Sequence, residues 1–407
     1  MATRFASSKA SMLEYGISTY LLIAYGVFLA GYFVTTNAVD HYKFLVGFLF
    51  IPGLLLLPRL FRELSQDSVF QLAAVYLLYL LASALWAETP DYTMLASHAI
   101  LAGLILFFVA ITAFLSATEP NWFDIIVVCA VAIAAGNALL SIILWDHLEY
   151  FTIMRLVGLG TMREPNSAGA VYGFYGLLAA VWGGRMESGM VRAALFAASM
   201  ALLGFLLLTQ ARAATIACVL ALTVLAALNR KHRPLTHLLV LVTALVIALV
   251  IAAGRENQSL LSSLSWDIRL ELWADGISQI ANAPLFGNGY LSGLEVYSET
   301  AKLSHSNVHN SYLAALRDGG IAGFALLAAL LGAAVHRAVQ TGRASGDYAL
   351  LALLCFGLVY MLTSTDALIT RPRELWVILW FPVGLLAGQR LAAGDSNGQP
   401  IARPPAP

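Results

Sequence analysis

Long apolar segments recur along almost the whole chain, and short polar segments separate them. A helix that crosses a bilayer needs about 20 predominantly apolar residues. On this criterion the pattern predicts an all-α integral membrane protein with about 12 transmembrane helices. The predicted spans lie near residues 15–35, 42–58, 69–87, 93–116, 122–145, 167–183, 191–209, 212–229, 235–253, 311–335, 348–365 and 374–391.

Two of the connections between these spans are much longer than the others. One covers residues 146–166, and the other is a large loop at 254–310, between the ninth and tenth spans. Connections longer than about 12–15 residues are usually functional or disordered. The large loop contains a predicted amphipathic helix from Trp266 to Ala281, whose apolar face carries Trp266, Leu270, Trp273 and Ile277. We expect this helix to lie at the membrane surface and to cover a cavity.

The chain therefore divides into four parts. Residues 1–253 hold spans one to nine with the loop at 146–166, residues 254–310 form the large loop, and residues 311–393 hold spans ten to twelve. Residues 394–407 are predicted to be a disordered cytoplasmic tail. Because Lys and Arg of short loops favour the cytoplasm, the dense basic turn at 230–233 predicts that both termini are cytoplasmic and that both long loops are periplasmic.

Composition supports this class of protein. Hydrophobic residues make up 60% of the chain and charged residues only 11%, against about 25% in soluble domains. The net charge of zero gives no indication of a nucleic-acid partner. The three cysteines lie in apolar runs without metal-ligand spacing, so we expect neither disulfides nor zinc. No nucleotide-binding, Ser/His/Asp or H-E-x-x-H motif is present, and we expect no cofactor and no metal.

His309 is the first candidate for chemistry. It precedes the apolar helix that starts at Asn310. The partial positive charge of a helix N-terminus disfavours imidazolium, so a neutral imidazole there can accept a proton from a sugar hydroxyl. The alternative is an interfacial polar residue near a helix cap.

Arg212 and Arg269 are the next candidates. Arg212 interrupts a long apolar run, which requires a tight hairpin at Thr209–Arg212; ionisable groups at such depth usually face an internal cavity, although snorkelling is an alternative. Arg269 lies among acids at 267, 271 and 275 on the loop helix. Local ion pairs of little energetic value are the simplest explanation for these acids, and a divalent-metal site is a weaker alternative.

Further arginines on the predicted outer side indicate an anionic ligand, because the guanidinium fork matches phosphate oxygens. Arg155, Arg163 and Asn166 belong to the loop at 146–166, and Arg371 and Arg373 belong to the last outer loop. Clusters of positive charge outside oppose the usual insertion preference, which favours a function for them in binding substrate.

These residues resemble the motifs of a known family. His309 and Asn310, followed by Gly320 and Gly323, match the pattern H-[NSQ]-x9-G-x-x-[GTY] of the O-antigen ligase/polymerase superfamily of bacterial inner-membrane proteins. Other matches follow in order: Glu164–Asn166, Thr209–Arg212, Arg269 and the P-x-x-G-x-G run at Pro284–Gly289. The resemblance covers about residues 150–330 and the twelve-span topology.

The resemblance implies a metal-independent, inverting glycosyltransferase with its active site facing the periplasm. His309 would activate the acceptor hydroxyl, and Arg212 and Arg269 would bind the diphosphate of an undecaprenyl-diphosphate-linked glycan donor. Asn310, Arg155, Arg163, Asn166, Arg371 and Arg373 are expected to line the substrate site. The implied partners are this donor, a lipid A–core acceptor and the lipid bilayer.

Two activities share these motifs. A ligase transfers O-antigen to lipid A–core oligosaccharide, whereas a polymerase transfers it to another lipid-linked repeat unit. The chain length, the twelve spans and the single large loop resemble the ligase more closely. Transfer to protein is less favoured because the chain ends soon after its twelfth span. A polysaccharide transporter is the non-enzymatic alternative, and it has no particular need for a base at His309.

Overall fold

A computed structural model describes residues 2–88, 91–145, 155–229, 266–293, 296–298, 303–305, 308–363 and 367–394. The described chain is helical apart from turns and one short antiparallel hairpin, β1 (Val296–Ser298) and β2 (Leu303–His305). The all-α class predicted from the sequence is thus confirmed, with a small hairpin inside the predicted large loop.

The helices of the first half are α1 (Ala2–Val34), α2 (Ala38–Phe44), η1 (Leu45–Phe50), α3 (Ile51–Gly53), η2 (Leu54–Leu56), α4 (Leu57–Leu64), α5 (Ser68–Ser83), η3 (Ala84–Trp86), α6 (Tyr92–Thr118), α7 (Pro120–Ile143) and α8 (Pro165–Arg185). The second half contains α9 (Gly189–Leu208), α10 (Arg212–Leu228), α13 (Trp266–Ile280), α14 (Ser311–Ser345), α15 (Ala349–Tyr360), η7 (Trp376–Trp380) and α16 (Phe381–Gly394).

Several of these helices fit a multi-pass membrane protein. By length and composition, seven segments of the described chain can cross a membrane: Gly16–Val34, Ala38–Leu64, Ser68–Trp86, Tyr92–Thr118, Pro120–Ile143, Gly189–Leu208 and Ser311–Ser345. Arg212–Leu228, Ala349–Tyr360 and Trp376–Ala392 are shorter apolar helices. The count of twelve stays a prediction. Its ninth span, at 235–253, and the tail beyond residue 394 lie outside the described residues.

Polar residues at the ends of the apolar runs fix where several helices begin. Asp67 accepts hydrogen bonds from the second and third backbone N–H groups at the start of α5, and Asp91 does the same at α6. Such caps satisfy backbone donors that have no partner inside the helix. Pro120 and Pro165 occupy the first position of α7 and α8, where a missing N–H costs nothing. The sequence therefore encodes these helix boundaries locally.

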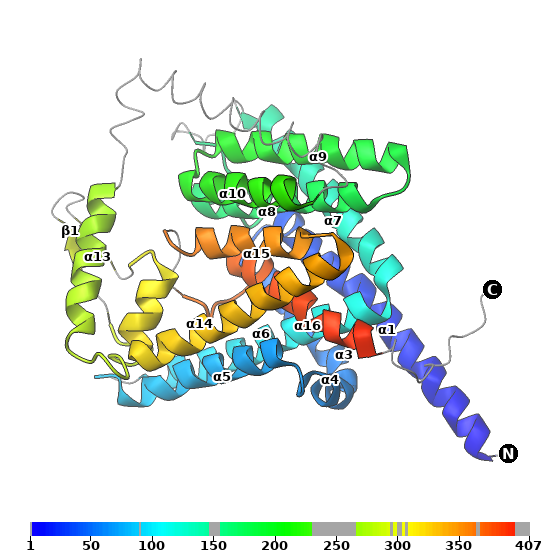
Figure 1. Cartoon of the computed structure of the whole chain (residues 1–407), viewed down its shortest axis with the longest axis horizontal. Helices are drawn as coiled ribbons and strands as arrows, with labels where there is room; N and C mark the ends of the chain where they lie inside the picture. Colours follow the sequence, from blue (N-terminus) through cyan, green and yellow to red (C-terminus); the bar gives the residue numbers. More distant parts are fainter. Residues whose placement is uncertain are drawn as a thin grey trace.

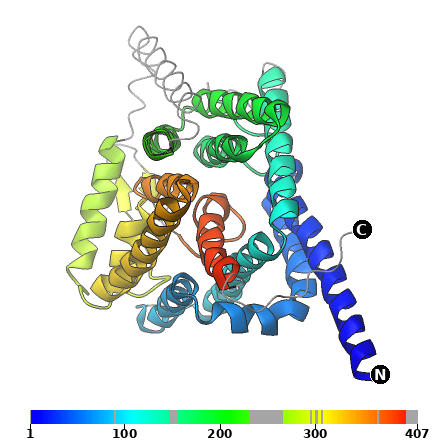
Figure 2. The same cartoon turned by 45° about the vertical axis from the view of Figure 1, so that its right-hand side comes forward.

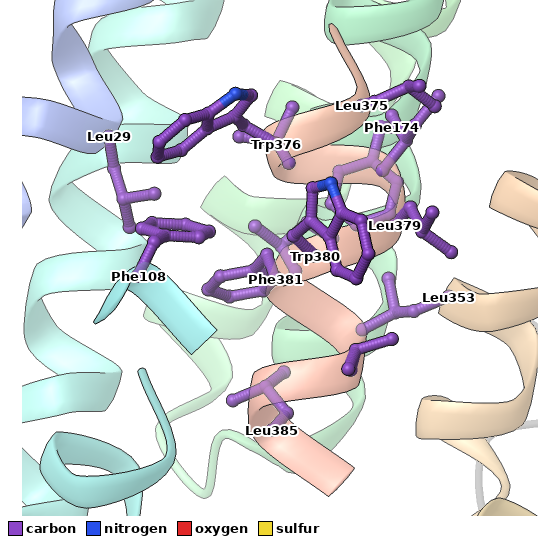
Figure 3. Packing of buried hydrophobic residues seen from close by; sticks show 14 of the residues in the cluster. Leu29, Phe108, Phe174, Leu353, Leu375, Trp376, Leu379, Trp380, Phe381 and Leu385 are labelled. Carbon is purple, nitrogen blue, oxygen red and sulfur yellow. The ribbon is translucent and has the colours of Figure 1, made fainter. Parts of the chain in front are cut away.

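The centre of the bundle is formed by η7 and α16, which the other helices surround (Figure 2). Trp376 and Trp380 of η7 are fully buried. They pack among side chains that include Leu29 of α1 and Phe108 of α6, as Figure 3 shows. The ring centroids of Phe108 and Trp376 are 5.3 Å apart. This packed core gives the surrounding helix ends a rigid support.

One side of the bundle collects the residues predicted to carry chemistry. In Figure 1, α13 stands at the left edge and runs across the direction of α9 and α10, while the N-terminal end of α1 lies at the opposite edge. The helices α10 and α14 begin on the α13 side, and α15 ends there (Figure 1). Helix direction thus brings together residues that are far apart in the sequence.

The predicted span at 311–335 lies within α14, which is long and apolar enough to cross a membrane. α14 extends to Ser345 and is kinked at Gly320, whose backbone angles (φ 63°, ψ −165°) are not helical. An apolar run predicts a helix but not a break inside it, because the break depends on a glycine and on a distant turn that binds there.

Candidate active site

The start of α14 holds His309 in a backbone conformation that few side chains adopt. Its φ is 50°, in the left-handed region that costs a residue other than glycine about 1–2 kcal/mol. Before it, the carbonyl oxygen of Val308 accepts a hydrogen bond from the indole nitrogen of Trp273 over 3.0 Å. After it, Asn310 caps α14 by accepting two backbone N–H groups, each at 3.0 Å. Hydrogen bonds on both flanks of His309 therefore fix the strained residue.

The same segment is tied to the end of α15. The backbone N–H of Ser311 donates to the carbonyl oxygen of Met361 over 2.9 Å, and the hydroxyl of Tyr312 donates to Leu358 over 2.9 Å. Tyr360, between these two acceptors, is close enough to Arg269 to act on its charge. The end of α15 is therefore a common neighbour of the His309 segment and of Arg269.

The helix predicted in the large loop is confirmed as α13. The face that α13 packs against the rest of the protein, however, is not the predicted apolar face. Leu270 and Ile277 are 57% and 60% exposed. Leu272 is fully buried instead and forms a small cluster with Val308 and Ala314. Helical periodicity finds an apolar stripe without telling which neighbour covers it, because in a membrane protein either protein or lipid can do so.

Three arginines from separate segments form a cluster in which Arg212 lies within electrostatic range of both Arg155 and Arg269. Burial lowers the pKa of Arg269; Tyr360 opposes this shift, and the charge of Arg212 lowers the pKa further. Burial also lowers the pKa of Arg155, with Glu164 opposing and Arg212 again lowering it. Arg212, which is exposed, is thus close to both others. Because like charges repel, the charge of Arg212 disfavours the cationic forms of Arg155 and Arg269, and a bound anion can stabilise them.

The tight hairpin predicted at Thr209–Arg212 is confirmed. α9 ends at Leu208, the turn contains Gln210 with a φ of 54°, and Arg212 is the first residue of α10. Thr209 stabilises the turn through its hydroxyl, which donates to the carbonyl of Leu206 over 2.6 Å. The turn therefore holds Arg212 at a helix end, where its side chain is exposed beside the other two arginines.

Arg155 is anchored to two of the predicted motifs. Its Nε donates to the carbonyl of Thr209 over 2.9 Å, and one Nη donates to Oδ1 of Asn166 over 2.7 Å. Glu164 caps α8 by accepting the backbone N–H groups of Asn166 and Ser167. The loop before α8 is therefore fastened to the turn that carries Arg212.

Tyr32 of α1 joins this loop to the last predicted outer loop. Its carbonyl oxygen accepts the N–H and the hydroxyl of Thr161, each over 3.2 Å, and its own hydroxyl donates to the carbonyl of Arg373 over 3.2 Å. The Arg373 side chain lies 3.3 Å from the buried carboxylate of Glu374. Arg371 lies over the ring of Tyr42, 5.5 Å from its centroid. Arg371 and Arg373 thus contact α1, α2 and their own loop, whereas Arg155, Arg212 and Arg269 form the cluster described above.

The two glycine motifs of the predicted family pattern form a single structural unit. At the kink of α14, the carbonyls of Pro284 and Leu285 accept the N–H groups of Ile321 and Ala322, over 2.9 and 3.1 Å. In return, the N–H groups of Asn288 and Gly289 donate to the carbonyls of Arg317 and Asp318, over 2.9 and 3.0 Å. The turn at 284–289 therefore satisfies backbone groups that the kink removes from the helix ladder.

Glycine is required on both sides of this contact. Gly320 and Gly287 have positive φ values of 63° and 76°. A Cβ on Gly320 would overlap the backbone of Leu285, and a Cβ on Gly287 would overlap the backbone of Asp318. Two backbones approach each other so closely that no side chain fits between them.

Sequence reasoning missed several residues that build the site. One of them is Arg317, which is only 6% exposed. Its guanidinium donates to Gln279 of α13 over 2.8 Å and to the carbonyls of Ser292 and Gly293 over 3.0 Å. Trp273 was recognised only as an apolar residue, and Tyr360 was not singled out. Their types alone carry no signal of these roles, because the partners come from other segments.

Among the described residues, no group of three or more His, Cys, Asp or Glu side chains could hold a metal ion; the side chain of Asp267, one of the acids beside Arg269, lies outside this description. Asp275 accepts a hydrogen bond from the side-chain amide of Gln279 over 2.6 Å.

Comparisons with known proteins agree with the motifs. Residues 197–328 match the family model described as O-antigen ligase. This range contains Arg212, Arg269, the turn at 284–289, His309 and the kink at Gly320. Over 414 aligned residues, which include 98% of this chain and the whole of the relative, the chain is 28% identical to an O-antigen ligase of Pseudomonas aeruginosa. The resemblance predicted from the sequence is thus confirmed: residues 197–328 match the O-antigen ligase family model, and the chain is similar to an O-antigen ligase over nearly its whole length.

Proposed function

We propose that this protein is an O-antigen ligase, a glycosyltransferase of lipopolysaccharide biosynthesis. It transfers O-antigen polysaccharide from undecaprenyl diphosphate to lipid A–core oligosaccharide at the periplasmic face of the bacterial inner membrane. The observation that carries this proposal is that one helix, α13, carries Arg269, which lies within electrostatic range of Arg212, and also donates a hydrogen bond from Trp273 to the carbonyl that precedes His309. Three fixed guanidinium groups suit a diphosphate, and a histidine at a helix start suits a base.

The arginines hold the donor and stabilise its leaving group. Arg212 and Arg269 bind the diphosphate, and Arg155 adds a third positive charge near Arg212. When the glycosyl–oxygen bond breaks, negative charge develops on the departing undecaprenyl diphosphate. Cations that are already in place stabilise that charge without reorganisation at the moment of reaction.

His309 activates the acceptor. Its imidazole accepts the proton of the acceptor hydroxyl, whose oxygen attacks the anomeric carbon of the donor sugar. One C–O bond forms as the bond to the diphosphate breaks, and the configuration at the anomeric carbon is inverted. The proton then leaves the imidazolium for the released diphosphate or for water. No step requires a metal ion, because the arginines supply the positive charge.

The remaining candidates are assigned to substrate contacts. Asn166, held by Arg155, and Asn310, beside His309, line the donor side. Arg163, Arg371 and Arg373 are exposed and are available to the anionic groups of the acceptor.

A polymerase is the second candidate, because it uses the same donor and the same chemistry. The relative described above is an O-antigen ligase that aligns over its whole length, which favours the ligase. A transporter fits less well, since transport gives no reason for a strained histidine between α13 and α14.

Transfer by the purified protein in lipid nanodiscs tests the proposal. Undecaprenyl-diphosphate-linked glycan is supplied with lipid A–core in one reaction and with lipid-linked single repeat units in another, with and without EDTA. We expect product on lipid A–core, unaffected by EDTA. Longer lipid-linked chains without core product would identify a polymerase, and transfer to neither acceptor would contradict both readings.

The orientation is tested separately by reporter fusions at Asn257, which lies outside the described residues. A periplasmic signal is expected, and a cytoplasmic signal would overturn the placement of the site.

A further inference from the structure

We propose that Trp273 is a positioning residue for His309. The hydrogen bond from its indole N–H to the carbonyl of Val308 fixes the left-handed backbone of His309 and so aims the imidazole. The consequence for catalysis rests on the proposed function, whereas the effect on the geometry of His309 does not.

The hydrogen bond acts on the Val308 carbonyl, a backbone group that restricts the conformation of His309. The Val308 carbonyl belongs to the peptide unit that precedes His309, so holding it restricts the φ of His309 directly. The bond is 3.0 Å long, and the buried side chain of Val308 lies 1% exposed beside Leu272. A position that is unfavourable for a side chain is retained only where its surroundings over-determine it.

α13 and the segment before His309 are in close contact. A Cβ on Gly276 of α13 would lie 2.9 Å from Cγ1 of Val308. Leu272, Gly276 and Trp273 thus place α13 directly on the residue before His309. Truncating the indole to a benzene ring removes the N–H and leaves this close packing in place.

The position of Trp273 also links the base to the phosphate-binding arginine. Arg269 precedes Trp273 by four residues, so both lie on one face of α13 about one turn apart. One rigid helix therefore sets the place of Arg269 and, through Trp273, the direction of His309. α13 thereby helps to set the distance between the leaving group and the base.

The test compares Trp273→Phe with a matched control, Trp182→Phe. Trp182 of α8 donates its indole N–H to Oδ1 of Asp124 over 2.9 Å, so the control loses the same type of bond at similar length. Both variants are prepared as full-length protein in nanodiscs. Carbethoxylation of each histidine by diethylpyrocarbonate is followed by mass spectrometry, with the other histidines of the chain as internal references. The steady-state transfer activity of the same variants is measured in parallel.

We expect the carbethoxylation rate of His309 to change several-fold in Trp273→Phe alone, with the other histidines unaffected. In transfer, kcat should fall by about 10- to 100-fold, because a base displaced by about 1 Å loses that much. The KM for the donor should stay unchanged, because the arginines remain. Unchanged reactivity of His309 in Trp273→Phe would overturn the inference, as would an equal change in Trp182→Phe. If the wild type transfers nothing, the proposed function fails, while the reactivity of His309 still decides the positioning role.

Discussion

Arg269 on α13 and Arg212 on α10 lie close enough for the charge of one to lower the pKa of the other. Between the two residues in the sequence lie the rest of the predicted span at 212–229 and the whole predicted span at 235–253. The fold brings them together because α10 begins on the side of the bundle that α13 crosses (Figure 1). Two like charges this close repel each other, and a bound anion lowers that repulsion. This relationship underlies the assignment of a diphosphate site.

Replacing Arg212 or Arg269 with Ala should reduce kcat/KM for transfer by about 100- to 1000-fold, the usual cost of removing one donor to a developing anion. Lys at either position should recover only part of the activity, because it lacks the bidentate fork. The double variant should lose less than the product of the single losses, since both side chains serve one diphosphate. Steady-state kinetics checks this. Arg343→Ala, at the far end of α14, is the control and should retain full activity; fully independent effects of the two arginines would contradict a shared ligand.

The kink of α14 should depend on a glycine. Gly320→Ala should lower the free energy of unfolding by about 1–3 kcal/mol from backbone strain, with overlap against Leu285 adding to it. Gly332→Ala is the matched control in the same helix, where a Cβ meets nothing within 4 Å, and it should be neutral or stabilising. Thermal unfolding in detergent compares the two. Equal melting temperatures would show that the turn at 284–289 does not constrain the kink.

The cap of α14 should matter for stability and for activity. Asn310→Ala should cost about 1 kcal/mol of stability, and it should also reduce kcat because it frees one flank of His309. Asp91→Ala removes an equivalent cap from α6 and should cost similar stability without affecting turnover. Thermal unfolding and transfer rates of both variants provide the check. An equal loss of turnover in both would mean that Asn310 acts only through stability.

The sequence predicts the helical class and the position of most helices because their signals are local. Apolar length marks the spans, and polar residues such as Asp67, Asp91 and Asn310 cap helices next to them in the chain. The hairpin at Thr209–Arg212 is likewise readable, since two helices fit the run only if they turn there. The seven described candidate spans agree with this reading, while the count of twelve stays a prediction.

The geometry of the site depends on pairs of residues that no local pattern connects. The motif glycines Gly287 and Gly320 are visible in the sequence, but their mutual backbone hydrogen bonds are not. The helix around Trp273 is predicted, whereas its bond to Val308 and the burial of Leu272 depend on which face meets α14. Arg317 looks like one more surface charge until its carbonyl partners are known. Periodicity in the sequence predicts which residues share a helix face, whereas the element that packs against that face is known only from the folded structure.

The most direct test of the account is single-turnover transfer to lipid A–core by His309→Asn, together with binding of the lipid-linked donor. Asn tolerates the left-handed conformation of His309, so the variant removes the imidazole and keeps the backbone. If His309 is the general base, the variant should bind the donor about as well as the wild type, and its transfer rate should be lower by about 100- to 10,000-fold, the contribution of a general base. Transfer at the wild-type rate with the donor still bound would contradict the role of His309 and with it the proposed chemistry.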